Sequence, residues 1–485
     1  MKKRTAVLAA IGLILVTAVI TAVGSGAGFR RFQRTRIVID GEVFSRDAQE
    51  ADFSGRPVTE TGKLTELTEL KKLDLRDTGL TVEEYEYLRQ KLPDCRILWT
   101  VPFQNGYLDE LTRELTVTEL TWEDLERMSY LPELDTVNAR ECEDYEMIRA
   151  LMRIYPELTV YYNVEIGGKQ YPENTSKLRI INGDMRGLRE GLEMLPHMET
   201  VTFLGKTPEN EQIRELMEQF PHITFVWNFE LFGVPVNSLD TRLNLSGIPM
   251  TSVAEVEEAL DYFYNLTWVE MCGCGIPSEE LDALWKRHPE TRFVWTVRVG
   301  ACTLRTDVTT FMPYQFGYDG FRKLYDRDTK ELKYCVDIMC MDMGHMGITD
   351  YSFLEYMPKM KYLVLADTDG TDFSALANLK ELVFLELFMT RFNQAEVLTG
   401  LTALEDLNLG HSGIKNIEPL KEMTWLKRLW MPGTVYTYPQ KRQELVDALT
   451  DTWVVFAAKG STDGGWRQSP NYYAMRDLLN MGYMN

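Results

Sequence analysis

The feature that most restricts the fold of this chain is a set of apolar residues that recur every 22 positions between Asp337 and Thr434. Each unit reads apolar-x-x-apolar-x-apolar. A short strand with two inward side chains cannot bury itself, so such units are stable only when neighbours stack into a parallel sheet over one apolar core. The three columns are Ile338, Met360, Leu382, Leu404 and Leu426; Met341, Leu363, Leu385, Leu407 and Leu429; and Met343, Leu365, Leu387, Leu409 and Met431.

A column of hydroxyl residues supports the same register. It lies three positions after the last apolar column and consists of Thr368, Thr390, Ser412 and Thr434. A side chain at this point turns inward, and its hydroxyl can satisfy backbone groups where the strand bends into the loop.

Taken together, these columns resemble leucine-rich repeats, in the 22-residue form used by internalin-like bacterial surface proteins. That family usually has Asn at the hydroxyl position, so Thr or Ser is a departure from its pattern. The resemblance implies a curved parallel sheet with helices and loops on its convex side. It also implies adhesion or surface recognition, although this fold hosts many functions.

The first half of the chain carries a longer period. Leu73, Val137 and Val201 stand 64 residues apart, and Val269 follows 68 later. After each comes a helix-like segment, then a second strand that follows a proline, then a glycine suited to a turn. The prolines are Pro93, Pro156, Pro221 and Pro289, and a third strand is indicated by Leu115, Leu178 and Leu243. We interpret each unit as a compound leucine-rich repeat with three strands.

We therefore predict an α/β fold, a leucine-rich-repeat solenoid from about residue 61 to 458, preceded by one N-terminal membrane-targeting helix. Residues 439–485 should contain a repeat remnant and a final segment, from Gly460, that caps the open end of the apolar column. The other predicted parts are a signal peptide or membrane anchor (1–36), a linker (37–60), compound repeats (61–330) and 22-residue repeats (331–438).

The N-terminal segment predicts membrane targeting. Lys2, Lys3 and Arg4 precede an uncharged apolar run from Ala6 to Val23. Small residues follow the run, so both cleavage and retention stay open. A short N-terminal tail favours export of the rest, which places the bulk of the chain outside the cytoplasm, at the cell membrane or cell surface.

Charge narrows the possible partners. The first 36 residues hold seven basic groups and no acid, so the remainder has 52 − 7 = 45 basic against 73 acidic side chains, a net charge of −28. Such a surface repels phosphate backbones, which argues against nucleic acid as a partner.

Motifs for catalysis and metal binding do not assemble in this sequence. It has no phosphate loop, no nucleophile elbow and no zinc-protease helix, and its five histidines share no motif. Cys272 and Cys274 are too few for a zinc site, and Cys142 and Cys274 each stand five residues after an inward strand position, which favours packing in the core. The soft ligands between Cys335 and Met346 would suit Cu(I), but two of the methionines fall in the apolar columns. We therefore predict a protein that is not an enzyme, with no cofactor, no metal and no small-molecule substrate.

The alternation of side chains along a strand predicts which residues face away from the core on the concave side of the sheet. Exposed aromatics among charged groups would be typical of a protein-binding hot spot, and they would also suit stacking on sugar rings. The alternative is that the C-terminal segment covers this face, or that it is ordinary solvent surface. The candidate partner-binding residues are Tyr362, Phe384, Glu386, Phe388, Asp406, Asn408, Arg428 and Trp430.

Three hypotheses for function follow. The first is an exported, membrane-associated repeat protein that binds a protein or glycan through its repeat surface. The second is a structural envelope protein that assembles with itself through the edges of the solenoid. The third is an enzyme with its site in the compound repeats, for which the sequence offers no support.

Overall fold

The computed structural model describes residues 35–313, 323–434, 439–460 and 463–481. The chain divides into two units, Met1–Phe225 and Val226–Asn485, and each is described by itself. The predicted membrane-targeting helix lies outside the described residues. Among the described residues, no helix is both long and apolar enough to cross a membrane.

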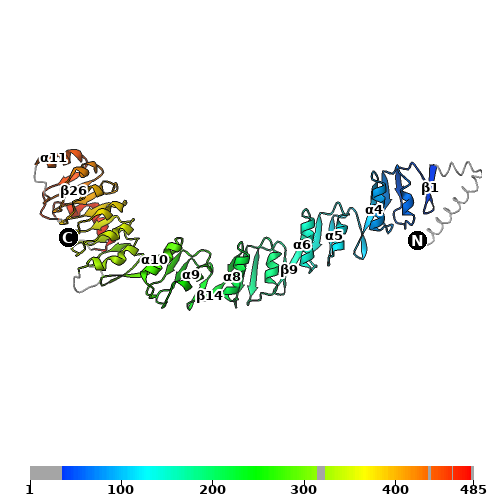
Figure 1. The fold of residues 1–485 in the computed structure, drawn as a ribbon, viewed down its shortest axis with the longest axis horizontal. Coiled ribbons are helices and arrows are strands. Elements are labelled where there is room, and N and C mark those ends of the chain that lie inside the picture. Colours follow the sequence, from blue (N-terminus) through cyan, green and yellow to red (C-terminus); the bar gives the residue numbers. More distant parts are fainter. Residues whose placement is uncertain (1–34, 314–322, 435–438, 461–462, 482–485) are drawn as a thin grey trace, which may run out of the picture. The chain divides into compact units, whose positions relative to one another are not determined.

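The N-terminal unit is built from small sheets of three parallel strands, and in the first two of them a fourth, antiparallel strand closes a hairpin (Figure 1). In the first sheet, Ala51, Leu73 and Ile97 lie side by side on adjacent strands. The first sheet comprises β3 (Glu50–Asp52), β4 (Lys72–Leu75), β5 (Arg96–Phe103) and the antiparallel β6 (Gly106–Asp109). The second comprises β7 (Glu114–Thr116), β8 (Thr136–Ala139), β9 (Thr159–Ile166) and the antiparallel β10 (Lys169–Pro172). The third comprises β11 (Lys177–Ile181), β12 (Thr200–Leu204) and β13 (Thr224–Val226).

Helices connect the parallel strands and bury one apolar face against them. Thr81 starts α4 (Val82–Lys91) with a capping box, because its hydroxyl accepts from the Glu84 amide while the Glu84 carboxylate accepts from the Thr81 amide. The same device starts α5 (Trp122–Met128) at Thr121. The remaining helices of this unit are α3 (Thr61–Leu64), α6 (Tyr145–Ile154), α7 (Leu188–Glu193) and α8 (Asn210–Gln219).

Two predictions for this unit are wrong. The predicted linker, 37–60, instead contains a hairpin of β1 (Arg36–Ile39) and β2 (Glu42–Ser45), then β3 of the first sheet. The apolar pattern is weak here because the small Ala51 stands where later repeats have Leu115, Leu178 and Leu243. The predicted unbroken spiral is also interrupted, because β5 continues past its parallel partner and pairs antiparallel with β6. The hydrogen-bonded sheet therefore restarts with each compound repeat.

The C-terminal unit begins with an antiparallel hairpin, and one more compound repeat of three parallel strands and a hairpin follows it. Its parallel strands align Leu243, Val269 and Phe293. The strands are β14 (Asn228–Leu231), β15 (Val234–Asn237), β16 (Arg242–Asn244), β17 (Trp268–Glu270), β18 (Arg292–Val294), β19 (Thr296–Val299) and β20 (Cys302–Arg305), with helices α9 (Ala254–Leu260) and α10 (Ser278–Arg287).

A seven-stranded parallel sheet follows and confirms the 22-residue columns. Met341, Leu363, Leu385, Leu407 and Leu429 are direct neighbours on successive strands, and all are fully buried. The strands are β21 (Thr310–Phe311), β22 (Cys340–Asp342), β23 (Tyr362–Val364), β24 (Phe384–Glu386), β25 (Asp406–Asn408), β26 (Arg428–Trp430) and β27 (Trp453–Val455). The connections from β22 to β26 are short 3-10 turns: η4 (Ser352–Tyr356), η5 (Ser374–Asn378), η6 (Ala395–Leu398) and η7 (Glu418–Glu422).

Three of the four residues in the hydroxyl column behave as predicted, whereas the Ser412 hydroxyl is buried without a hydrogen-bond partner among the described residues. The hydroxyls of Thr368, Thr390 and Thr434 each donate to the carbonyl three residues earlier, at 2.6, 2.7 and 2.9 Å. Each bond satisfies a buried carbonyl where the strand leaves the sheet.

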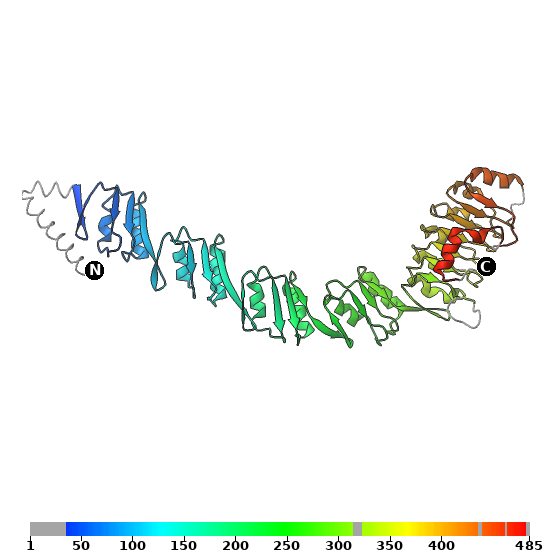
Figure 2. The same cartoon turned by 180° about the vertical axis from the view of Figure 1, so that it is seen from behind.

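The final segment of the chain was predicted to cap the open end of the apolar column, and this prediction is wrong. Helix α11 (Pro439–Ala448) and strand β27 extend the repeat stack at the place of the predicted repeat remnant. The final segment, with the 3-10 turn η8 (Trp466–Gln468) and helix α12 (Pro470–Leu478), packs on the sheet face opposite the leucines (Figure 2). We call residues 463–481 the cover and the sheet face beneath it the outer face.

Candidate partner-binding surfaces

The eight predicted partner-binding residues lie on or next to the outer face, as the register requires. Their predicted exposure is wrong for five of them, because the cover packs on this face. Phe384, Glu386, Asp406, Asn408 and Trp430 are buried. The other three, Tyr362, Phe388 and Arg428, are half-buried. The alternative that the C-terminal segment covers this face is confirmed.

Aromatic rings form the centre of the contact between cover and outer face. The ring of Trp466 lies 5.0 Å from that of Phe384 and 5.5 Å from that of Trp430, measured between centroids. Tyr472 lies 6.3 Å from Phe384. Such tilted pairs add to the free energy of burying large apolar rings.

Hydrogen bonds cross this contact in both directions, because Arg428 of the sheet donates to the carbonyls of Gly465 and Trp466 at 3.0 and 3.3 Å, while side chains of the cover donate to the sheet. Trp466 Nε1 donates to Glu386 Oε2 at 2.8 Å. The Ser469 hydroxyl donates to Asp406 Oδ2, and Asn471 Nδ2 donates to the same oxygen at 3.2 Å. The side chains of the cover therefore supply donors, and the buried carboxylates of the outer face supply acceptors.

Burial changes the acidity of these carboxylates. Burial raises the pKa of Glu386 from its usual 4.5 to about 7, against the opposing hydrogen bond from Trp466. Burial also raises the pKa of Asp406, and that of Asp342 on β22. The outer face thus holds a row of carboxyl groups that bind protons more tightly than carboxyl groups in water.

Two polar atoms on the outer face are buried without a hydrogen bond among the described residues. They are Asn408 Nδ2 and Trp430 Nε1. Leaving a buried polar atom without a partner is costly, so these two atoms lower the stability of the contact between the cover and the outer face.

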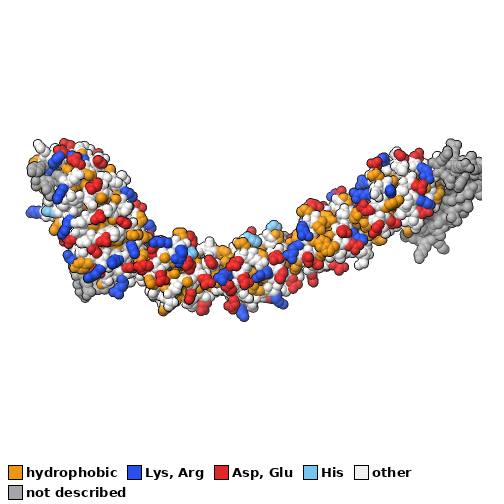
Figure 3. All heavy atoms as spheres, viewed as in Figure 1, with side chains coloured by type: hydrophobic (Ala, Val, Ile, Leu, Met, Phe, Trp, Pro, Cys, Tyr) orange, Lys and Arg blue, Asp and Glu red, His pale blue; other side chains and the backbone are white. Residues whose placement is uncertain are grey.

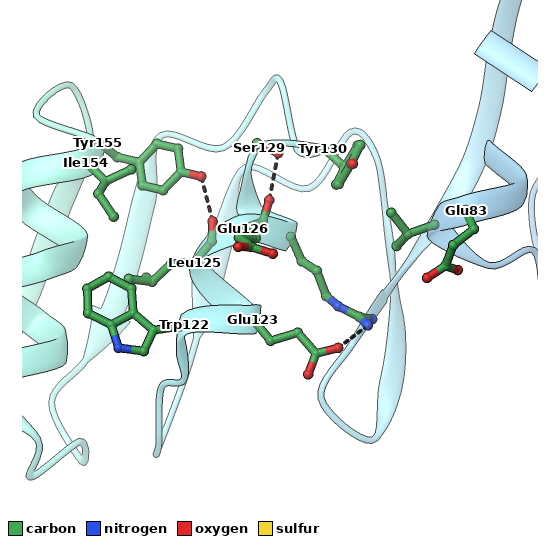
Figure 4. Close-up of a pocket in the computed structure, with 11 residues that line it drawn as sticks. Glu83, Trp122, Glu123, Leu125, Glu126, Ser129, Tyr130, Ile154 and Tyr155 are labelled. Atoms are coloured by element: carbon green, nitrogen blue, oxygen red, sulfur yellow. Dashed lines mark hydrogen bonds and ion pairs between the residues drawn. The ribbon is translucent and has the colours of Figure 1, made fainter. Parts of the chain in front are cut away.

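A second candidate surface lies in the N-terminal unit, at a pocket of about 620 Å³ between α4, α5 and α6 (Figure 4). Trp122, the first residue of α5, and Ile154, the last of α6, line it with 55% and 46% of their surfaces exposed. Figure 3 shows hydrophobic side chains gathered over the part of the molecule around α5 and α6. Large exposed apolar groups beside a pocket are typical of a contact site.

Comparison between repeats makes Ile154 unusual. In each of the four compound repeats a helix ends two residues before the proline that precedes the second strand. Ile154 is the last residue of this helix in α6. The corresponding residues of α4, α8 and α10 are Lys91, Gln219 and Arg287. The sequence prediction missed this site, although one apolar residue at an otherwise polar, solvent-facing position was a signal that could have found it.

Charges around the pocket are mainly negative. Glu83, Glu123 and Glu126 line it together with one cation, Arg127. Arg127 pairs with Glu123 and also donates to the carbonyl of Pro102 at 2.7 Å. The Tyr155 hydroxyl donates to the carbonyl of Leu125 at 2.6 Å and fixes one wall (Figure 4). The pocket therefore combines apolar walls with an acidic rim.

The cysteines lie where the packing interpretation predicts. Cys142 and Cys274 are buried, and Cys274 Sγ lies 3.1 Å from the carbonyl oxygen of Leu245. Burial raises the pKa of both thiols, which disfavours the reactive thiolate. The described residues contain no group of three or more His, Cys, Asp or Glu side chains that could hold a metal ion.

Comparisons with known proteins give structural neighbours only. No family model and no curated protein matches the sequence. An internalin from Listeria monocytogenes is 13% identical, with 86% of this chain and 84% of that chain covered and a TM-score of 0.25. A leucine-rich-repeat protein from Leptospira interrogans is 13% identical, with 85% and 96% covered and a TM-score of 0.28. Internalin C2 from Listeria monocytogenes is 17% identical, with 44% and 80% covered and a TM-score of 0.26. The leucine-rich-repeat fold of this chain rests on its own stacked strands.

Proposed function

We propose that this chain is a non-catalytic, membrane-associated leucine-rich-repeat protein that lies mainly outside the cytoplasm and binds a protein ligand. The observation that carries the proposal is the exposure of Trp122 and Ile154 beside the pocket of the N-terminal unit. Tryptophan is among the residues most enriched at the energetic centre of protein interfaces.

The acidic rim indicates the chemistry of the ligand. Glu83, Glu123 and Glu126 outnumber the single Arg127, whose charge is already paired with Glu123. A ligand segment that presents an apolar side chain next to a lysine or arginine would fill the pocket and meet its charge. The net charge of −28 after residue 36 would steer such a cationic ligand towards the chain.

A site-specific cross-link tests the proposal. Trp122 is replaced by a photoreactive phenylalanine analogue in the full-length protein, which is then mixed with an envelope extract of the source cells and irradiated. The matched control carries the same analogue at Tyr107, an exposed aromatic of β6 outside the pocket. We expect a discrete protein adduct at position 122 that the control does not form. A glycan adduct, or equal labelling at both positions, would reject the protein ligand.

Protease accessibility tests the location. In intact cells, an externally added protease should degrade the repeats if the bulk of the chain is exported. Protection in intact cells together with digestion after lysis would contradict the proposed location. Mass measurements over a range of concentrations separate this function from self-assembly, which predicts a rise in mass.

A further inference from the structure

The two faces of the seven-stranded sheet differ in composition, although the same strands supply both. The inward face carries uninterrupted apolar columns. The outer face carries Asp342, Glu386, Asp406 and Asn408 among its aromatics, on the three strands β22, β24 and β25. Burying ionisable groups is costly unless they are fully paired. If the outer face were permanently buried, we would therefore expect it to be apolar.

The environment of Glu386 leaves its charge poorly compensated. Its hydrogen bond comes from Trp466, while Arg467 of the cover and His345 attract its negative charge and Asp342 repels it. At Asp406, Ser469 and Asn471 donate hydrogen bonds, Arg428 attracts the carboxylate and Glu405 repels it. Around Asp342, the Gly344 amide donates to the carboxylate at 2.9 Å, and His345 and Arg467 attract it.

The donors of the cover match these acceptors. The indole of Trp466, the hydroxyl of Ser469 and the amide of Asn471 meet two carboxylates on adjacent strands. We propose that the cover is a releasable occupant of a second binding surface, and that the outer face, once uncovered, binds a protein segment with the same aromatic and donor groups. This surface is distinct from the Trp122 pocket and does not depend on it.

Protonation of Glu386 makes the equilibrium between the covered and uncovered states depend on pH. The pKa of Glu386 is raised while the cover is in place and returns towards 4.5 when the cover leaves. The covered state is therefore most favoured below pH 4.5, loses stability as the pH rises towards 7, and loses no more above it. The shift corresponds to a change on the order of 100-fold in the equilibrium between covered and uncovered states. Asp406 and Asp342 act in the same direction.

Hydrogen–deuterium exchange of the full-length protein at pH 5 and pH 7.5, corrected for intrinsic rates, tests the release. We expect protection of the amides of α12 to fall at least about tenfold at the higher pH, while amides of β24 and β25 stay protected. In Glu386→Gln, which keeps an acceptor for Trp466 but cannot ionise, protection of α12 should change clearly less with pH than in the wild type, and the remaining change comes from Asp406 and Asp342. Glu396→Gln, at an exposed carboxylate of η6, is the matched control and should behave as the wild type. Equal protection of α12 at both values in the wild type would overturn the proposed release.

A labelled synthetic peptide with the sequence of residues 463–481 tests the binding surface. The peptide buries Glu386 as the cover does, so ionisation weakens both equally. The peptide should therefore bind Trp466→Ala, whose cover has lost its central ring, more tightly than the wild type at either pH, and a scrambled peptide should not bind. Release of α12 without peptide binding would refute the second binding surface. If Glu386→Gln fails to fold, Trp466→Phe serves instead, because it keeps an aromatic ring, though a smaller one, and removes the donor, and it should lower the protection of α12 at both pH values. The cross-link at position 122 reports separately on the Trp122 pocket.

Discussion

Trp466 Nε1 donates a hydrogen bond to Glu386 Oε2 at 2.8 Å, and so joins the end of the chain to a strand 80 residues earlier. This bond shows that the two faces of the repeat sheet are buried by different partners. Leucines from neighbouring repeats bury the inner face, and the cover buries the outer one. The contacts of the inner face join neighbouring repeats, whereas the contacts of the outer face join the sheet to a segment that is distant in sequence.

Replacing Phe384 by alanine should destabilise the C-terminal unit by about 3–5 kcal/mol, because its ring is fully buried between the sheet and Trp466. Phe388→Ala, at a half-buried ring, is the control and should cost clearly less. Chemical denaturation followed by tryptophan fluorescence measures both. Equal, small effects would contradict the position of the cover.

The hydroxyl column should contribute through its hydrogen bonds rather than its volume. The Thr390 hydroxyl donates to the Leu387 carbonyl at 2.7 Å in the core, so Thr390→Val should cost about 1–3 kcal/mol by leaving that carbonyl unpaired. Thr399 makes a similar bond to the Glu396 carbonyl at 2.9 Å but is partly exposed. Water can replace its hydroxyl, so Thr399→Val should have a much smaller effect. Thermal unfolding of the two variants compares them, and a larger loss for Thr399→Val would disprove this account.

Much of this fold could be predicted because each repeat reports the same register independently. Leu363, Leu385, Leu407 and Leu429 fall at one interval, and only stacked strands explain the agreement among columns. The breaks between compound repeats could not be predicted. They arise because the second half of β5 pairs antiparallel with β6, and the sequence pattern does not distinguish this pairing from a continued parallel one.

The candidate sites were harder to predict than the fold. Alternation along the strands placed Phe384 and Trp430 on the outer face, but the occupant of that face lies in a segment outside the repeats. No periodic signal links Trp466 to Glu386. By contrast, Ile154 could have been found from the sequence by comparing it with Lys91 and Arg287, the residues at the same helix position.

Gly433 should not tolerate a side chain. Its φ of +66° is left-handed, and an added Cβ would meet the imidazole of His411. We expect Gly433→Ala to cost at least about 1–2 kcal/mol from the backbone conformation alone. Gly460→Ala is the control, since its Cβ would have no atom within 4 Å. The two unfolding midpoints should differ clearly, and equal midpoints would show that the loop relaxes freely.

Acid should loosen the contact between α9 and α10. Hydrogen bonds from Arg287, then from His288, lower the pKa of Glu257 to about 2. Because this pKa lies below its usual value of 4.5, the pair stabilises the fold above pH 4.5 and loses that effect as the pH falls towards 2. Glu257→Gln should therefore reduce the drop in melting temperature between pH 6 and pH 3. An unchanged drop would indicate that other carboxylates account for the acid sensitivity.

The Trp122 pocket gives the last prediction, which separates binding from folding. Ile154→Arg introduces the residue type that α10 carries at the same position, Arg287, and the site is solvent-exposed, so stability should change by less than about 0.5 kcal/mol. The new charge would nevertheless stand in the pocket and repel a cationic ligand, while Trp122→Ala would remove its largest apolar surface. Both variants should abolish the adduct formed by a photoreactive analogue placed at Tyr130, another residue of the pocket lining, in the same protein. Tyr107→Ala, outside the pocket, should leave that adduct intact. A variant that melts like the wild type and still forms the full adduct would show that Trp122 and Ile154 are ordinary surface residues.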